Sequence, residues 1–302
     1  MILGLLDVED LLKLFDDKTY RPRVLDEFTR RLTTALALFV PDPDAFRGMM
    51  REVGGLVGGS VALWFTTSLP RSWRPQHLDL LVPPGCAHTV RKCLLAVRGA
   101  EVVSGKDLRW ELSDNWYLKK EVYCVWTTRG VVRVIHGIYQ NWDALSLVPR
   151  YWGTHLMNVL SADALVVPYM RLTLLGRAIG KDVREAIGDD ETAEGYDFDK
   201  TPEDPRGFTL HESGAEFANL RKGCYNFVGC RQRERWFTDK ETLLIQIGRG
   251  GGEDPFQSFR RSCWGWKLDV DPCANRSCFF TREFTIIPHG VYAMDVMPAH
   301  DM

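Results

Sequence analysis

Apolar side chains recur at helical spacing through the first fifty residues of the chain. One apolar pattern predicts a helix over residues 8–17, and a second predicts a longer helix that begins near Pro22 and continues to Phe39. Asp42 before Pro43 is the capping pattern of a third helix, and a pair of glycines ends it. The sequence therefore predicts three short helices before the first strand.

The pattern changes near residue 56, where a short apolar strand runs into a Gly-Gly-Ser turn at residues 58–60 and then into an apolar helix. Residues 77–82 alternate apolar and polar positions in their first half and stop at two prolines, which is typical of a strand near a sheet centre. A helix is expected across residues 90–97. The order strand, glycine turn, helix, strand is thus predicted, with the two strands adjacent in one sheet.

Further strands and helices follow up to residue 180. Two β-rich runs at residues 122–127 and 131–135 flank Arg129 and Gly130, which predicts a hairpin. We then expect a helix at residues 151–160, a strand at 164–167 and a helix at 172–179. These segments predict a mixed α/β (α+β) fold with a sheet flanked by helices.

The chain beyond residue 180 has a different composition. Residues 181–206 are acidic and poor in apolar side chains, which predicts a linker or mobile loop, most mobile from Asp189 to Glu194. Residues 207–302 are rich in Arg, Trp and Cys, with strand-like runs at 243–247 and 284–287. We therefore expect a main domain within residues 1–180, an acidic linker, and a smaller C-terminal region.

Composition narrows the classes of function. Hydrophobic residues make up 45% of the 302 positions and charged residues 26%, and the formal net charge is -2, so long nucleic acids are unlikely partners. No apolar run reaches the roughly 20 residues that span a bilayer, and the chain does not start like a secretory signal. Eight cysteines without such a signal are expected to be reduced thiols. A cytoplasmic or nuclear protein without membrane contact is predicted.

The candidate site begins at the Gly58-Gly59-Ser60 turn. Glycines allow a tight turn after a strand, and the free N–H groups of the following helix can receive a phosphate. On the next strand, His77 and Asp79 are two residues apart and therefore share a face. The turn and the strand pair together predict a polar site at one edge of the sheet.

These residues resemble the nucleotidyltransferases of the DNA polymerase β superfamily, in which a glycine turn and a short helix precede a strand with two acidic residues one position apart. The resemblance covers roughly residues 50–180 and extends to uncharacterised fungal proteins of this fold. It is carried by three segments: Ser60-Val61-Ala62-Leu63, His77-Leu78-Asp79-Leu80-Leu81-Val82-Pro83 and His155-Leu156-Met157-Asn158-Val159-Leu160. It implies that Gly58, Gly59 and Ser60 hold the phosphates of a nucleoside triphosphate, and that Asp79 binds Mg²⁺ or Mn²⁺.

The sequence also departs from the family. His77 stands at the first acidic position, and imidazole suits zinc, copper or iron better than magnesium. The later strand that should carry a third carboxylate offers Arg133 and His136, and Glu121 on the preceding strand is a weak substitute. One carboxylate cannot bridge the metal ions on which phosphoryl transfer depends, so lost or altered catalysis is predicted.

Other charged and metal-ligating residues allow additional hypotheses. Arg71 and Arg74 are candidates to grip a polyphosphate, with solvated loop arginines as the alternative. Basic residues interleaved with aromatic residues at 221–237 suit stacked bases, or else form a charged face over an aromatic core. The cysteine pairs at 224/230 and 273/278 are spaced more widely than is usual for structural zinc.

Three functions are consistent with these patterns. The first is a nucleotidyltransferase with an altered metal site, and the second is a non-catalytic descendant that senses nucleotide or binds protein. The third is an enzyme of unrelated chemistry with His77 or His136 as general acid or base. If nucleotide binds, Asp79→Asn is expected to weaken metal-dependent binding and leave the fold intact, on the premise that the carboxylate is exposed. His77→Asp is expected to strengthen magnesium-dependent binding.

Overall fold

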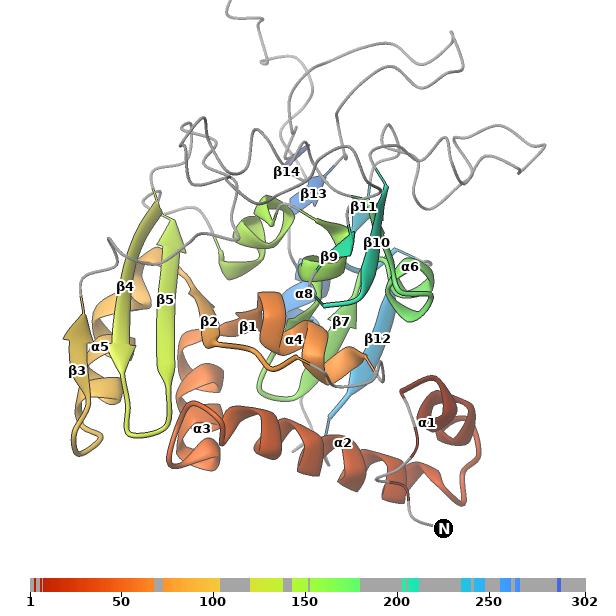
Figure 1. Cartoon of the computed structure of the whole chain (residues 1–302), viewed down its shortest axis with the longest axis horizontal. Helices are drawn as coiled ribbons and strands as arrows, with labels where there is room; N and C mark the ends of the chain where they lie inside the picture. The colour runs from red at the N-terminus through yellow and green to blue at the C-terminus, as the bar shows by residue number, and fades with distance from the viewer. Residues whose placement is uncertain are drawn as a thin grey trace, which may run out of the picture.

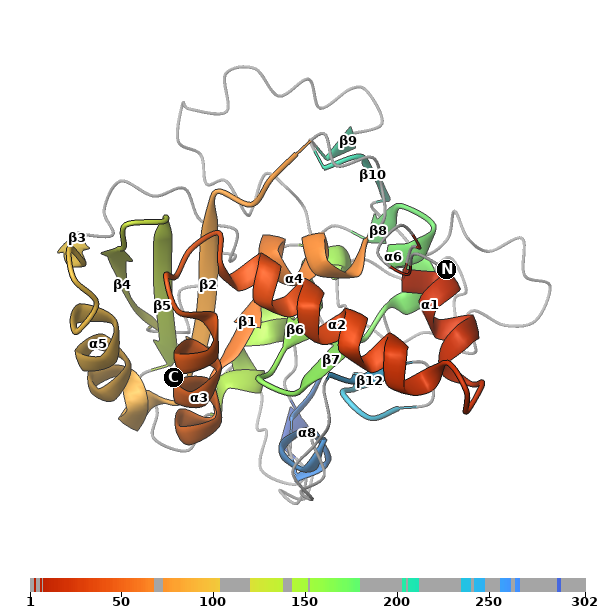
Figure 2. The same cartoon turned by 90° about the horizontal axis from the view of Figure 1, so that it is seen from below.

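The fold is that of a computed structural model, drawn in Figure 1 and seen from below in Figure 2. The residues that it describes are 3, 6, 8–67, 73–103, 120–137, 143–151, 153–179, 203–204, 206–211, 235–239, 242–247, 256–261, 264–266 and 287–288. The statements below refer to these residues. Several features discussed above lie outside these residues: the acidic stretch from Asp189 to Glu194, Arg71, the cysteines at 224, 230, 273 and 278, and the basic residues at 221–233.

The three N-terminal helices form as predicted. They are α1 (Val8–Phe15), α2 (Arg21–Leu36) and α3 (Pro43–Val53). The Asp42 side chain accepts hydrogen bonds from the backbone N–H groups of Asp44 and Ala45, which satisfies two donors of the first turn of α3. Gly54 ends this helix in the left-handed conformation, with φ of 65°. Capping residues therefore determine both ends of α3.

The central element is an eight-stranded mixed sheet in the order β12-β7-β6-β1-β2-β5-β4-β3. Its strands are β1 (Leu56–Gly58), β2 (His77–Val82), β3 (Glu101–Val103), β4 (Lys120–Trp126), β5 (Val131–Gly137), β6 (Val159–Leu160), β7 (Ala164–Val167) and β12 (Leu243–Gln246). The β2–β5 pair is parallel and the other neighbours are antiparallel. The strand at 77–82 thus lies inside the sheet, as predicted.

The order of segments from residue 56 to residue 82 is confirmed. β1 leads into α4 (Gly59–Thr66), and β1 pairs with β2 in one sheet, with Val57 opposite Leu80 and Gly58 opposite Asp79. The short 3-10 helix η2 (Pro84–Cys86) and α5 (Ala87–Leu95) follow β2. The predicted hairpin is the antiparallel β4–β5 pair. This arrangement brings the glycine turn beside Asp79.

Apolar side chains on the two faces of the sheet belong to different cores. Leu78, Leu80 and Val82 pack on one face with residues of α1 to α5, and α2 crosses in front of the sheet in Figure 2. Leu81 and Ile135 pack on the other face in a second core with the 3-10 helix η4 (Ala144–Arg150). Alternation along β2 therefore assigns His77, Asp79 and Leu81 to the second face.

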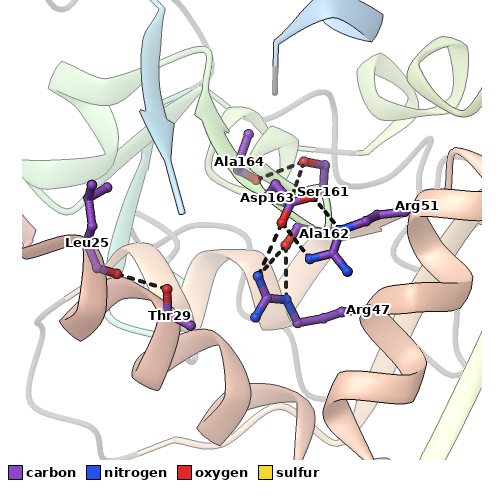
Figure 3. Close-up of polar contacts among 8 residues, drawn as sticks. All are labelled: Leu25, Thr29, Arg47, Arg51, Ser161, Ala162, Asp163 and Ala164. Atoms are coloured by element: carbon purple, nitrogen blue, oxygen red, sulfur yellow. Dashed lines mark hydrogen bonds and ion pairs between the residues drawn. The ribbon is translucent and has the colours of Figure 1, made fainter. Parts of the chain in front are cut away.

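The α3 helix is tied to the turn between β6 and β7 (Figure 3). The Arg47 guanidinium donates two hydrogen bonds to the Ala162 carbonyl, at 3.0 and 2.9 Å, and the Arg51 guanidinium forms a two-pronged contact with the Asp163 carboxylate at 2.6 Å for each pair of atoms. The Ile247 N–H donates to the Asp163 carbonyl. One turn thus links the helical layer, the hairpin and the end of β12.

Two helix predictions were wrong in part. Residues 151–160 were expected to be helical, but they contain only the 3-10 helix η5 (Thr154–Met157), which β6 follows. Residues 172–179 were expected to form one helix, but α6 (Met170–Leu174) ends early and β8 (Arg177–Ile179) follows it. Gly176, with φ of 64°, lies between them and breaks the helix. The strand at residues 164–167 is confirmed as β7.

Two smaller sheets complete the described part of the chain. One has the order β8-β10-β9, with β9 (Glu203–Asp204) and β10 (Phe208–His211), and the other has the order β11-β13-β14, with β11 (Arg235–Trp236), β13 (Trp264–Trp266) and β14 (Ile287–Pro288). Phe237, Trp266 and Phe259, the last in α8 (Gln257–Arg261), pack in the second core. The division into domains stays a prediction, although β12 adds a C-terminal strand to the main sheet. Among the described helices, none has the length and apolar character to cross a membrane.

Candidate functional site

The glycine turn lies where β1 ends and α4 begins. Gly59 has φ of 61°, in the left-handed region that favours glycine, which explains the need for this residue in so tight a turn. The turn is nevertheless not open, because Gly58, Gly59 and Ser60 are all buried. The resemblance implies a turn that phosphates can reach. Here the chain itself covers it.

Asp79 and Arg133 form a buried ion pair next to this turn. They lie directly opposite each other in the parallel β2–β5 pair, so their side chains emerge on the same face. The Arg133 Nε donates to Asp79 Oδ1 at 2.5 Å and its Nη2 to Oδ2 at 2.7 Å. Both side chains are about 1% exposed. Both carboxylate oxygens of the expected metal ligand are therefore engaged by a guanidinium.

Tyr151 closes the space above the turn. Its hydroxyl donates to Asp79 Oδ2 at 3.3 Å, and burial next to that carboxylate raises the pKa of Tyr151 well above its usual value. A Cβ added to Gly58 would lie 2.6 Å from the Tyr151 hydroxyl oxygen, and one added to Gly59 would lie 3.1 Å from its ring. Only glycine at both positions allows the ring to pack so closely.

The Asp79 carboxylate is close to the N-terminal end of α4. A Cβ at Gly59 would lie 2.8 Å from Asp79 Oδ2, and within the described residues no side chain caps this helix. A helix N-terminus favours a negative charge, so the carboxylate is placed where the resemblance would put a phosphate. The Arg133 guanidinium, which contacts both oxygens of this carboxylate, supplies a positive charge beside it. The chain thus provides both charges of the site from its own side chains.

His77 borders this ion pair but does not bind to it. Its Nε2 lies 3.8 Å from Asp79 Oδ1, which is beyond hydrogen-bonding distance. The pKa of His77 is lowered to about 4, first by burial; the negative charge of Asp79 opposes this shift, and the positive charges of Arg133 and Arg206 add to it. His77 is therefore neutral at pH 7. As a general acid it would be protonated in only about one molecule in a thousand.

Arg206 is a second arginine near Asp79, and sequence reasoning missed it. Burial lowers its pKa to about 10, and the nearby negative charge of Asp79 acts in the opposite direction. Its guanidinium carbon lies 5.9 Å from the centre of the Trp73 ring, within the range of a cation–π contact. Arg206 comes from the end of the acidic stretch, far from β2 in sequence. No local pattern links it to the site.

His136, Glu121 and Arg74 hold other positions in the fold. His136 pairs with Val82 in register, so alternation places it on the helix-covered face, opposite Asp79. There its Nδ1 lies 3.1 Å from the Gly137 carbonyl oxygen. Glu121 pairs with His136, three register positions from Arg133. Arg74 is exposed on the segment before β2.

The described residues contain no metal centre of the usual kind. Among them, no group of three or more His, Cys, Asp and Glu side chains lies close enough to hold a metal ion. Asp79, with both oxygens on Arg133 and an imidazole rather than a carboxylate nearby, does not offer the hard oxygen ligands that magnesium requires. The residues of this site therefore fit Mg²⁺ poorly.

Comparisons with known proteins do not assign the chain to a family. The chain matches no protein-family model, no curated protein and no solved structure. The function must therefore be argued from the site.

Proposed function

We propose that this chain is a nucleotidyltransferase-like protein that has exchanged catalysis for a binding role. The observation that carries the proposal is the two-pronged contact of Arg133 with Asp79. Arg133 lies on β5, the strand on which the resemblance leads us to expect a third carboxylate. An arginine in that position neutralises the remaining acid from within the chain. A metal ion would have to displace this buried guanidinium from both carboxylate oxygens of Asp79.

The covered turn supports the same proposal. A triphosphate needs the backbone N–H groups at the start of α4, but Gly59 is buried beneath Tyr151 and next to the Asp79 carboxylate, and Ser60 is buried as well. A phosphate placed there would have to displace the Tyr151 ring and would lie against the Asp79 carboxylate, which already occupies the N-terminal end of α4. Nucleotide binding at this turn is therefore disfavoured along with nucleotide transfer.

The general acid or base hypothesis receives less support. His77 is a weak base with a pKa of about 4, and His136 lies on the other face of the sheet, so the two histidines cannot act on one substrate. A binding role, with protein or small molecule as partner, remains the best interpretation. The exposed indole of Trp126, which is 51% accessible, is one surface from which a partner search can start.

Calorimetric titration of ATP and GTP, with Mg²⁺ or Mn²⁺ and without metal, tests the proposal together with an assay for label transfer from the same nucleotides. We expect neither binding nor transfer. His77→Asp should not create magnesium-dependent binding, because Arg133 still engages Asp79. Arg74→Ala, which changes an exposed arginine, is the matched control for weak electrostatic association. Micromolar, metal-dependent binding that survives Arg74→Ala would overturn the proposal.

A further inference from the structure

The α5 helix lies at the β3 end of the sheet, at the margin of the molecule (Figure 2). Its inner side is fixed to the fold, because Val90 and Leu94 are buried in the core that the helices share with the sheet. The Tyr123 hydroxyl on β4 also donates to the Ala87 carbonyl at 2.7 Å. The outer side of α5 is therefore held in place and faces solvent.

This outer side carries positive charges. Arg91 and Lys92 are exposed on the helix, and Arg98 is exposed in the turn that follows it. From residue 80 to residue 100 the chain contains no Asp or Glu. Glu52, at the end of the neighbouring helix α3, is exposed as well, but within the described part of the chain none of the three basic side chains forms an ion pair. These charges are therefore available to a partner.

Exposed apolar side chains lie among the charges. Leu95, at the end of α5, is 37% exposed, and it follows Arg91 by one helical turn, so the two side chains share the outer side of the helix. Val102 on β3 is 38% exposed and pairs with Val125, whose side chain is buried on the helix-covered face. Alternation thus places Val102 on the same side of the sheet as α5.

We propose that this surface binds an acidic protein segment that also carries an apolar side chain. The inference rests on the proposed binding role and names the class of its partner. The guanidinium groups can form two-pronged contacts with carboxylates, and opposite charge selects an acidic partner. The exposed apolar groups offer a contact that a purely ionic partner would leave unused. We call this surface the α5 edge, and it consists of Arg91, Lys92, Leu95, Arg98 and Val102.

Nucleic acid and lipid fit the α5 edge less well. None of its five residues is aromatic, and Trp126, which pairs with Glu101, projects from the other face of the sheet, so bases have no ring on which to stack. The formal net charge of -2 does not favour a long polyanion. The apolar side of α5 at Val90 and Leu94 is already buried, so it is not available to enter a lipid surface.

A synthetic peptide built from Glu-Glu-Leu repeats is the probe, and its matched control has glutamine in place of every glutamate. Binding to the whole chain is followed by fluorescence anisotropy of the labelled peptides. We expect the acidic peptide to bind at least about tenfold more tightly than the control, with a difference that shrinks at high salt. No nucleotide is present, so failure here would leave the outcome with ATP and GTP unchanged. Equal binding of the two peptides, or no binding of either, would overturn the inference.

Matched variants locate the contact. Arg91→Glu should weaken binding of the acidic peptide at least about threefold, whereas Arg23→Glu, at an exposed position of α2, should not. Leu95→Ser should weaken it about threefold, whereas Leu175→Ser, at a side chain that is 68% exposed after α6, should not. Circular dichroism checks that each variant is folded, and Arg91→Gln replaces Arg91→Glu if the latter is not.

The other classes of partner are tested in parallel with oligothymidylate and with phosphatidylserine vesicles. We expect both to bind more weakly than the acidic peptide. Tighter binding of either one, lost in Arg91→Glu, would assign the surface to nucleic acid or lipid and overturn the inference. Unchanged binding of the peptide in the Arg91 and Leu95 variants would equally remove the α5 edge as its site.

Discussion

Two arginine–carboxylate clusters hold this sheet, and they differ in their access to water. Asp79 and Arg133 face each other across two central strands and are almost fully buried. Asp163 joins Arg47 and Arg51 at the end of a hairpin, where the Arg51 side chain is 50% exposed and that of Asp163 is 30% exposed (Figure 3). The same chemical groups should therefore contribute very different amounts to the free energy of unfolding.

Burial decides the difference. In the central pair, the desolvation of both ions is offset mainly by their mutual contact, so the loss of one partner removes the main compensation for the other buried charge. In the hairpin cluster, water solvates whatever the partner leaves behind, and the pair contributes little. The comparison explains why one cluster can close a site while the other serves as an attachment point for α3.

The largest effect is expected for Asp79→Asn. The amide removes the negative charge from the two-pronged contact with the buried Arg133 guanidinium, so the free energy of unfolding should fall by about 3–5 kcal/mol. Urea denaturation followed by circular dichroism measures this, with Asp163→Asn as the surface control. This outcome replaces the expectation of an intact fold, which assumed that the Asp79 carboxylate is exposed. A loss below about 1 kcal/mol would contradict the buried pair.

The double variant Asp79→Leu, Arg133→Met sharpens this result. It removes both charges and keeps apolar volume, and such replacements of buried pairs are often neutral or stabilising. We expect it to recover most of the stability that Asp79→Asn loses. If the double variant is as unstable as the single one, the packing of Tyr151 and the glycine turn, rather than the charge balance, determines the stability of this region.

A smaller effect is expected for Arg47→Met. Its guanidinium is mostly buried and donates two hydrogen bonds to the Ala162 carbonyl, which the thioether cannot replace. Leaving that buried carbonyl unsatisfied should cost about 1–3 kcal/mol in urea denaturation. Arg23→Met, at an exposed position of α2, controls for the change of residue type. No loss of stability would show that water satisfies the Ala162 carbonyl.

A modest effect is expected for Tyr151→Phe. The hydroxyl contributes one long hydrogen bond of 3.3 Å to Asp79, while the ring supplies the packing over Gly58 and Gly59. The variant should therefore lose only about 0.5–1.5 kcal/mol of unfolding free energy. Tyr151→Ala should lose more, because it opens a cavity over the turn. Equal losses in the two variants would mean that the hydroxyl, and not the ring, stabilises the site.

Local patterns predicted most of the first half of the fold. Asp42, Pro43 and Gly54 place the ends of α3 through their own backbone preferences, and alternation in residues 77–82 places β2. The errors at residues 151–160 and 172–179 arise where tertiary pairing competes with helical periodicity. Val159 and Leu160 pair with β1 and β7, and residues 177–179 pair with β10, contacts that no window of sequence contains.

Only the part of the site that lies on β2 and in the adjacent glycine turn could be predicted from the sequence. The period of two places His77 and Asp79 on one face, and the glycine turn beside them follows from the order of segments. The partners that change the interpretation come from distant segments: Arg133 by strand register, Tyr151 after η4 and Arg206 before β10. Of these, only Arg133 had a signal in the sequence, as an arginine on a strand expected to carry an acid.

The smallest effect is expected for Arg51→Ala, in the more exposed of the two clusters. Its two contacts with Asp163 are short, but half of the Arg51 side chain is in water and its removal leaves Asp163 with Arg47. The free energy of unfolding should fall by at most about 1 kcal/mol, and the loss should shrink at high salt, which screens exposed pairs. Urea denaturation of the parent and the variant, at low salt and at 1 M salt, measures both quantities. Asp79→Asn measured in parallel should show a loss that salt hardly changes, because its partner is shielded from mobile ions. A loss at Arg51 as large and as salt-independent as that at Asp79 would remove the distinction between the two clusters.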